Sequence, residues 1–369
     1  MQNIKIYYLI NQLLDNRNIN KLNLKKFSKK KIKIRVINFY NQSNIRYSKF
    51  EYYNFYDNKI KIIKDIIFNR PKYFVDISNK TIGEIFLQRL LKIFGSKRVI
   101  FDIGLIPVEK IKYGLLKYFL KNKKYFKFFY KIIERIFYKL IFLIVLPRVD
   151  ISFTSGRVGR KLAILRKDKK IVQAHNLDFD NFLKIKNKKN NSKNLIVYID
   201  QDIENSIDFK MDGIEFYNVQ KFNKTILRFL SSYGSKVVIA GNNRRKIKKN
   251  IFGIKTIYNK TDQLIKNSKL VIGHNSTALQ YAILFKKPII LLSTKEIQLI
   301  PTMHKNILTL RKLLNCEYYF LKDNLIKKKK INYKFNKKLY SKYINNYITE
   351  NPNNKRKFFD LILNSLDLN

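Results

Sequence analysis

The segment 268–292, SKLVIGHNSTALQYAILFKKPIILL, constrains the fold more than any other part of the chain. Leu270 to Ile272 is a short apolar run with β-branched residues, which predicts a buried strand. The polar residues Gly273 to Thr277 follow, and 278–285 then carries apolar residues at helical spacing. Ile289 to Leu292 predicts a second buried strand. This order of strand, turn, helix and strand is typical of a parallel α/β sheet.

The turn between the first strand and the helix has the chemistry of an anion site. A helix N-terminus presents backbone N–H groups and a partial positive charge, which attract phosphate. Ser276 and Thr277 add hydroxyl donors, His274 adds a further donor, and Gly273 lets a ligand approach the backbone closely. Thr277 and Gln280 also stand at the spacing of a capping box. An ordinary capped helix is therefore the alternative interpretation.

This segment resembles the sugar-nucleotide domain of bacterial glycosyltransferases of the GT-B type that build capsule, lipopolysaccharide O-antigen or other surface polysaccharides. It also resembles the related turn of the non-hydrolysing sugar-nucleotide epimerases. The residues that carry the resemblance are Gly273–His274–Asn275–Ser276–Thr277–Ala278, Tyr281–Ala282 and Lys287–Pro288–Ile289–Ile290. Together with the order of elements around them, they cover about half the chain.

The resemblance implies two Rossmann-like doubly wound α/β domains, a nucleotide sugar as substrate, no cofactor and no metal. It implies that Gly273 to Thr277 bind the nucleotide sugar, together with Gly241 and Arg244 from an earlier turn. The similar surface-glycan enzymes carry a histidine–proline–basic segment at that earlier turn. This chain has Asn242–Asn243–Arg244 there, so a histidine contact is missing while an arginine can still bind a phosphate.

Composition limits the class of protein. A chain of 369 residues with 46% hydrophobic residues can form two domains with real cores. The net charge of +51 favours an acidic partner, either nucleic acid or an anionic membrane. Lysines are spread along the whole chain with many Asn, Ile, Tyr and Phe, which indicates an AT-rich genome as the main cause. We therefore expect no specific nucleic-acid partner and a membrane contact as a by-product of the charge.

The sequence shows no signal peptide and no apolar run of the roughly 18 residues that a spanning helix needs. Its single cysteine, Cys316, suggests a reducing compartment. We expect a cytoplasmic protein in peripheral contact with the inner face of the cytoplasmic membrane. The basic and aromatic segment 111–146 predicts a pair of amphipathic helices in the headgroup region, with a nucleic-acid groove or a core-facing helix as alternatives.

The first half, 1–185, is predicted to be a Rossmann-like acceptor domain. Strands are expected at 4–10, 33–40, 73–77, 98–103, 149–153 and 171–174, and helices at 60–68 and 85–94. The first of these helices is expected to turn one apolar side inward, formed by Ile60, Ile63, Ile66 and Ile67.

Polar residues that follow these strands are the candidates for the acceptor site, because open α/β sheets bind ligands beyond the carboxyl ends of their strands. They are Ser78, Gly83, Ser155 and Gly156. The resemblance implies a carboxylate or histidine base in this half, so Asp102, Glu109 and His175 are catalytic candidates, with helix caps and a structural histidine as alternatives. Asp178 and Asp180 could bind a cation, but the resemblance does not imply one.

The polar stretch 184–194 predicts a linker, 194–335 a Rossmann-like donor domain, and 336–369 two helices that pack back on the first domain. Asp200 follows the strand predicted at 195–199 and is expected at the ligand-binding edge. The first functional hypothesis is transfer of a sugar from a nucleotide sugar to a glycan or lipid-linked acceptor. An epimerase acting on a sugar nucleotide is the second, and the scarcity of acids argues against it. A nucleic-acid-binding protein is the third, supported by charge alone.

Overall fold

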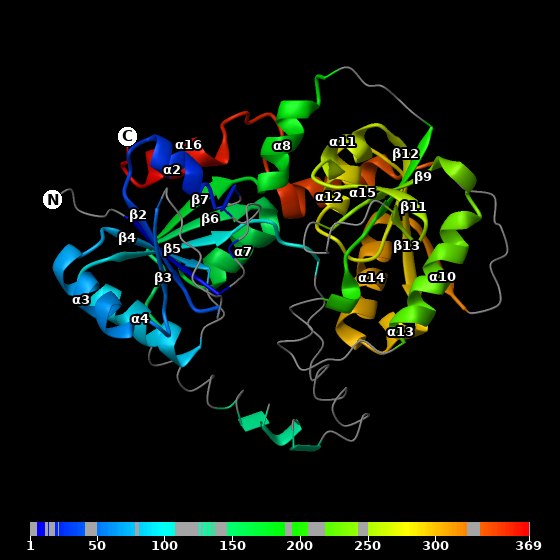
Figure 1. Cartoon of the computed structure of the whole chain (residues 1–369). Helices are drawn as coiled ribbons and strands as arrows, with labels where there is room; N and C mark the ends of the chain where they lie inside the picture. The colour runs from blue at the N-terminus through cyan, green and yellow to red at the C-terminus, as the bar shows by residue number, and fades with distance from the viewer. Residues whose placement is uncertain are drawn as a thin grey trace. The chain divides into compact units, whose positions relative to one another are not determined.

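In the computed structural model, the residues described are 6–11, 14, 19–20, 22–40, 50–77, 81–107, eight positions between 125 and 136, 146–188, 194–205, 218–242, 250–322 and 333–368. The chain forms two compact units. The first unit comprises 1–105, 133–177 and 349–369, and the second comprises 106–132 and 178–348. Each unit is a parallel α/β sheet structure, which confirms the predicted fold class of two Rossmann-like domains (Figure 1).

The first unit is built on a seven-stranded sheet in the order β3-β2-β1-β4-β5-β6-β7, and every strand pair in it is parallel. The strands are β1 (Ile6–Ile10), β2 (Ile34–Asn38), β3 (Glu51–Asn54), β4 (Tyr73–Ile77), β5 (Lys97–Asp102), β6 (Ile151–Ser155) and β7 (Lys170–Ala174). The helices are α2 (Leu24–Lys29), α3 (Lys59–Asn69), α4 (Ile82–Ile93), α7 (Gly156–Leu165) and α16 (Phe358–Ser365). The strand order reverses between β1 and β4.

Two separate cores cover the two faces of this sheet. On one face, Leu24 and Phe27 of α2 pack in the same cluster as Phe358 and Ile362 of α16. On the other face, α3 and α4 turn inward a second set, Ile62, Ile66, Leu87 and Leu91. Figure 1 shows α3 and α4 together on one side of the first sheet, with α2 and α16 on the other. Central strands buried on both faces explain why β1 (IYYLI) and β6 (ISFTS) carry apolar or small residues without alternation.

The second unit is built on another seven-stranded sheet, in the order β10-β11-β9-β8-β12-β13-β14. Its pairs are parallel except β10 with β11. The strands are β8 (Leu195–Ile199), β9 (Val237–Ala240), β10 (Asn250–Ile251), β11 (Ile254–Ile257), β12 (Ser268–Gly273), β13 (Ile289–Thr294) and β14 (Glu317–Leu321). The helices are α8 (Leu177–Ile185), α10 (Val219–Ser231), α11 (Thr261–Lys266), α12 (Leu279–Leu284), α13 (Lys295–Gln298), α14 (Pro301–Leu314) and α15 (Lys337–Tyr343).

The last part of the chain divides between the two units. Helix α15 and the π-helical turn Ile344–Ile348 belong to the second unit, and only the segment from Thr349 onward joins the first. There Phe358 is fully buried, and its ring lies edge-on to Phe101 at 5.4 Å and to Phe153 at 5.8 Å. The boundaries expected at 185 and 336 therefore differ from the observed division, which falls at 177 and 348.

Several local predictions are wrong, each for a physical reason. On α3, Ile66 is buried as predicted, but Ile60 is 72% exposed and Ile62 is buried in its place. Helix α3 carries apolar residues on opposite sides, so their spacing does not reveal which side faces the core. The capping box at Thr277 and Gln280 does not form: α12 starts only at Leu279, and its N-cap residue makes no side-chain cap hydrogen bond. The predicted linker 184–194 begins too early, because Lys184 and Ile185 form the end of α8.

Candidate functional site

The strand order of the second sheet reverses between β8 and β12, so the loops after these two strands leave toward opposite sides of the sheet. The strands are paired in register, with Val197 opposite Val271 and Tyr198 opposite Ile272. Consequently Asp200 and Gln201, after β8, lie at the same edge as the turn after β12. This is the edge at which doubly wound sheets bind ligands.

The turn after β12 presents donors that the protein itself does not use. Backbone N–H groups of Leu279, Gln280 and Tyr281 are taken by the carbonyls three residues earlier, and the Ala278 N–H donates to the Ser276 hydroxyl at 3.2 Å. Within the described part of the chain, the backbone N–H groups of Ser276 and Thr277 and the Thr277 hydroxyl have no hydrogen-bond partner. All three belong to half-buried residues, so they remain available to an anion.

His274 lies behind this turn and cannot donate from it. Its side chain is fully buried, its Nδ1 donates to the Leu292 carbonyl at 2.8 Å, and its Nε2 accepts from the Tyr198 hydroxyl at 3.0 Å. Burial lowers the pKa of His274 to about 4, so the ring is neutral near pH 7. The expected contact between His274 and the nucleotide is thus not available in this conformation. His274 instead ties the end of β12 to β8 and β13.

Three neighbouring loops are tied together at this edge by hydrogen bonds. Gln201 accepts the Asn275 N–H on its Oε1 at 2.9 Å, which joins the loops after β8 and β12. Asn242, in the loop after β9, donates its side-chain amide to the Gln201 carbonyl at 3.0 Å and its N–H to Asp200 Oδ2 at 3.3 Å. Asp200 Oδ1 also accepts the Asp202 N–H at 3.0 Å. Asp200 therefore orders the loops through its carboxylate.

The structure also explains two of the predicted glycines. A Cβ on Gly241 would lie 2.5 Å from the Tyr258 ring and 2.8 Å from the Thr256 methyl group, so packing alone requires glycine there. A Cβ on Gly273 would meet nothing closer than 3.5 Å, at the Leu279 side chain. The fold therefore tolerates a Cβ at Gly273, where it would be in ordinary van der Waals contact with Leu279 and Ile199.

Sequence reasoning missed a pair of residues at the end of β13. The Ser293 hydroxyl and His304 Nδ1 are 2.9 Å apart, and β13 is the neighbour of β12. Ser293 is fully buried, while His304 is half-buried and burial lowers its pKa. The only signal in the sequence was the polar Ser293–Thr294 directly after an apolar strand. His304 comes from α14, a helix that the sequence analysis did not predict.

The candidates in the first unit are held by other interactions. The carboxylate of Asp102 forms an ion pair with Arg166 at 2.6 Å. His175 is 1% exposed, its Nε2 lies 2.8 Å from the Arg356 carbonyl, and burial lowers its pKa to about 4. The Ser155 hydroxyl donates to the Asp102 carbonyl at 3.4 Å. These contacts give His175 a structural role in binding the C-terminal segment, and they pair the Asp102 carboxylate with an arginine.

The remaining predicted residues divide into two groups. Gly156 starts α7 with a φ of +62°, which favours glycine, and a Cβ on Gly83 would lie 3.0 Å from the Phe55 ring, so both glycines have structural reasons. Ser78, Glu109 and Arg244 lie outside the described residues. The structure thus brings together Asp200, Gly241 and the turn Gly273–Thr277 in the second unit, and Asp102, Ser155 and Gly156 in the first.

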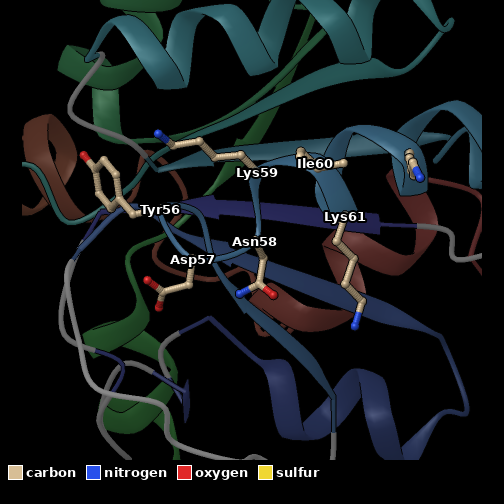
Figure 2. A pocket seen from close by; sticks show the side chains of 7 residues that line it. Tyr56, Asp57, Asn58, Lys59, Ile60 and Lys61 are labelled. Atoms are coloured by element: carbon tan, nitrogen blue, oxygen red, sulfur yellow. The ribbon is translucent and has the colours of Figure 1, made fainter.

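Among the described residues of the first unit there is an open hollow of about 690 Å³. It lies at the start of α3 and is lined by Tyr56, Asp57, Asn58, Lys59, Ile60, Lys61 and Lys64 (Figure 2). None of the predicted site residues lines it. No group of three or more His, Cys, Asp or Glu side chains that could hold a metal ion occurs in the described ranges.

Comparison with known proteins supports the fold. The sequence matches no protein-family model and no curated protein. Among solved structures, the chain is similar to UDP-GlcNAc 2-epimerase from Methanocaldococcus jannaschii in complex with UDP-GlcNAc and UDP, with 13% identity and a TM-score of 0.51 over 99% of this chain and 100% of that one. A second structure of UDP-GlcNAc 2-epimerase from this organism has 14% identity and a TM-score of 0.47 over 99% and 100% of the chains. MurG from Acinetobacter baumannii has 7% identity and a TM-score of 0.42 over 86% of each chain. The chain therefore shares the two-domain α/β fold of the M. jannaschii epimerase in complex with UDP-GlcNAc and UDP.

Proposed function

We propose that the protein transfers a sugar from a nucleotide-sugar donor to a glycan or lipid-linked acceptor during synthesis of a cell-surface polysaccharide. One observation carries the proposal: the unused N–H groups of Ser276 and Thr277 lie at the switch point of the second sheet. The diphosphate of the donor would bind there. As the glycosidic bond breaks, the leaving diphosphate gains negative charge, and donors fixed in place stabilise that charge.

Epimerisation of a sugar nucleotide is the second candidate, because the same fold occurs in the similar epimerases. Inverting a carbon centre requires groups that remove and return a proton at the sugar. At this edge of the sheet, Asp200 is 7% exposed and accepts two backbone N–H groups, and the neutral His274 has both ring nitrogens engaged. Sugar transfer needs chiefly hydrogen-bond donors to the diphosphate, and the turn after β12 supplies them, so the described residues favour sugar transfer over epimerisation.

A binding measurement tests the proposal first. UDP, GDP, CMP and ADP would each be added to the purified protein and the thermal unfolding midpoint recorded, with single-stranded RNA as the competing ligand. A UDP sugar is the first donor to test, because the similar structure from M. jannaschii contains UDP-GlcNAc and UDP. A rise in midpoint with one nucleotide supports the proposal. Stabilisation by RNA alone would overturn it.

A second experiment separates the two reactions. The protein would be incubated with the stabilising nucleotide sugar without an acceptor, and the sugar followed by proton NMR. Inversion of a ring carbon without release of the nucleotide would identify an epimerase. A transferase would leave the donor intact or release nucleotide slowly by hydrolysis, and would turn over faster with membrane extracts that supply a lipid-linked acceptor.

The acceptor and the membrane contact belong to the same proposal. Among the described residues, no helix has the length and apolar character needed to cross a bilayer. The described positions of the predicted amphipathic segment expose large side chains, among them Phe126 at 85%, Phe129 at 61% and Ile133 at 67%. Such exposure, with the charge of +51, supports peripheral contact with an anionic leaflet.

A further inference from the structure

The helices α3 and α4 in the first unit are apolar on two sides. Their inner sides join one core cluster through Ile62, Ile66, Leu87 and Leu91. Their outer sides expose a second set of large apolar residues: Ile60 at 72%, Phe68 at 81%, Phe86 at 54% and Ile93 at 76%. A helix at the surface of a globular protein normally carries one apolar stripe, so the second stripe needs a partner.

The outer stripes follow helical spacing and lie beside each other. On α3, Ile60, Ile67 and Phe68 are separated by seven and eight residues, and on α4, Phe86 and Ile93 are separated by seven. The two helices lie close at both ends. At the start, Gly83 in the first turn of α4 lies against the ring of Phe55, which precedes α3. At the end, the Arg70 guanidinium after α3 lies 5.9 Å from the centroid of the Phe94 ring after α4. Both stripes therefore form one outer surface, which we call the α3–α4 face.

The charges on these two helices are sorted by side. Lys59, Lys61 and Lys64 are exposed and line the hollow at the start of α3. The acids of α3 and α4 point inward: Asp65 forms an ion pair with Arg35, and the fully buried Glu84 accepts from the Asn11 side chain. Figure 2 shows Lys59, Ile60 and Lys61 together at the start of α3, with Asp57 in the loop before them as the exposed acid.

We propose that the α3–α4 face binds the anionic surface of a lipid bilayer. Large apolar side chains interspersed with lysines, with the acids of α3 and α4 turned away and Asp57 outnumbered by three lysines, match the headgroup region of an anionic leaflet. The apolar residues enter the acyl boundary and the lysines contact phosphates. Three lysines around an open hollow suit a phosphate headgroup. The proposal assigns a surface outside the basic segment 111–146. It does not depend on the transfer reaction.

The test measures binding of the full chain to vesicles of phosphatidylglycerol and phosphatidylcholine, and to vesicles of phosphatidylcholine alone, by flotation. Wild-type protein should bind the anionic vesicles at least tenfold more strongly. A variant that combines Ile60→Ser, Phe68→Ser, Phe86→Ser and Ile93→Ser should bind the anionic vesicles at least tenfold more weakly than wild type. A second variant that combines Lys59→Gln, Lys61→Gln and Lys64→Gln should lose a comparable share of the affinity. Because these side chains are exposed, the thermal midpoint should stay unchanged, and the nucleotide-induced shift should persist.

The matched control is Ile164→Ser with Leu165→Ser, which removes exposed apolar side chains from α7 in the same unit. It should bind vesicles like the wild type. The proposal is overturned if the α3–α4 variants bind normally, if the α7 control loses as much, or if only Phe126→Ser with Phe129→Ser abolishes binding. It is also overturned if single-stranded RNA binds to the α3–α4 face while vesicles do not.

Discussion

Gln201 and Asn275 are 74 residues apart in the sequence, yet the side chain of the first accepts the backbone N–H of the second at 2.9 Å. This bond fixes the start of the turn that presents the unused N–H groups of Ser276 and Thr277. It directs the Asn275 N–H toward the protein, and so leaves the next two N–H groups to a ligand. The loop after β8 thus sets the geometry of the loop after β12.

We expect Gln201→Ala to weaken nucleotide binding by about 1 kcal/mol, or roughly fivefold, because the turn loses the bond that orders it. Isothermal titration with the stabilising nucleotide measures this. Gln263→Ala, at an exposed position on α11 of the same unit, is the control and should bind normally. Equal affinity of Gln201→Ala and wild type would show that the loop after β8 does not order the site.

Thr277→Ala should weaken nucleotide binding by roughly 1–3 kcal/mol, the range for a hydrogen bond to a charged group. The Thr277 hydroxyl has no hydrogen-bond partner among the described residues, so we expect the substitution to leave the free energy of unfolding unchanged. Adding Ser276→Ala should weaken binding further, although it also removes the acceptor of the Ala278 N–H. Ser231→Ala, exposed on α10, serves as the control. Unchanged affinity of the double variant would place the phosphate elsewhere.

The two glycines should respond differently to alanine. Gly241→Ala forces a Cβ to 2.5 Å from the Tyr258 ring, and we expect a loss of unfolding free energy of about 1–3 kcal/mol in urea titration. Gly273→Ala has room in the fold, so stability should change by less than about 1 kcal/mol. If the nucleotide approaches the backbone at Gly273, the Gly273→Ala protein should bind the nucleotide more weakly even though its stability is nearly unchanged. A stable Gly273→Ala protein with normal affinity would contradict that approach.

Stability should depend on pH through His274. The pKa of this ring is about 4 in the folded protein because burial lowers it, against about 6.5 in the unfolded chain. Below pH 6.5 the unfolded state binds a proton that the folded state excludes, so stability is full above pH 6.5 and falls as the pH drops toward 4, by at most about 3 kcal/mol. Urea unfolding at pH 7.5, 6 and 5 measures this loss.

His274→Gln is the matched variant for the pH experiment. It should be less stable than wild type at pH 7.5, because its amide cannot reproduce both ring contacts, to Leu292 and Tyr198. The difference should narrow as the pH falls to 5. A difference that stays constant from pH 7.5 to 5 would mean that the His274 ring is not held neutral.

The parts of the fold that depend on local pattern were predictable. The strands at 73–77 and 195–199 are apolar runs with sharp polar ends, and the structure has β4 and β8 at these bounds. β14 was missed because an edge strand is half-buried, and its sequence EYYFL neither alternates nor reads as a core run. Helix α3 was found, but its apolar residues on two sides hid which side faces the core.

The candidate site was predictable only in part. The turn at Gly273–Thr277 could be located because strand, glycine and hydroxyl residues stand in order along the chain. The role of Gln201 depends on the pairing of β8 with β12, which no local pattern encodes. The direction of the His274 ring depends on Tyr198 and Leu292, which come from two other strands. Long-range pairing therefore decides which of the polar residues face a ligand.

Phe358 completes an aromatic cluster whose other members, Phe101 and Phe153, are synthesised more than 200 residues earlier. During translation, this face of the first sheet can be covered by α2 but lacks α16 until the second unit has been synthesised. The exposed apolar face would be a natural binding surface for chaperones in that interval. Removal of Phe358 with the rest of α16 would consequently damage the core of the first unit.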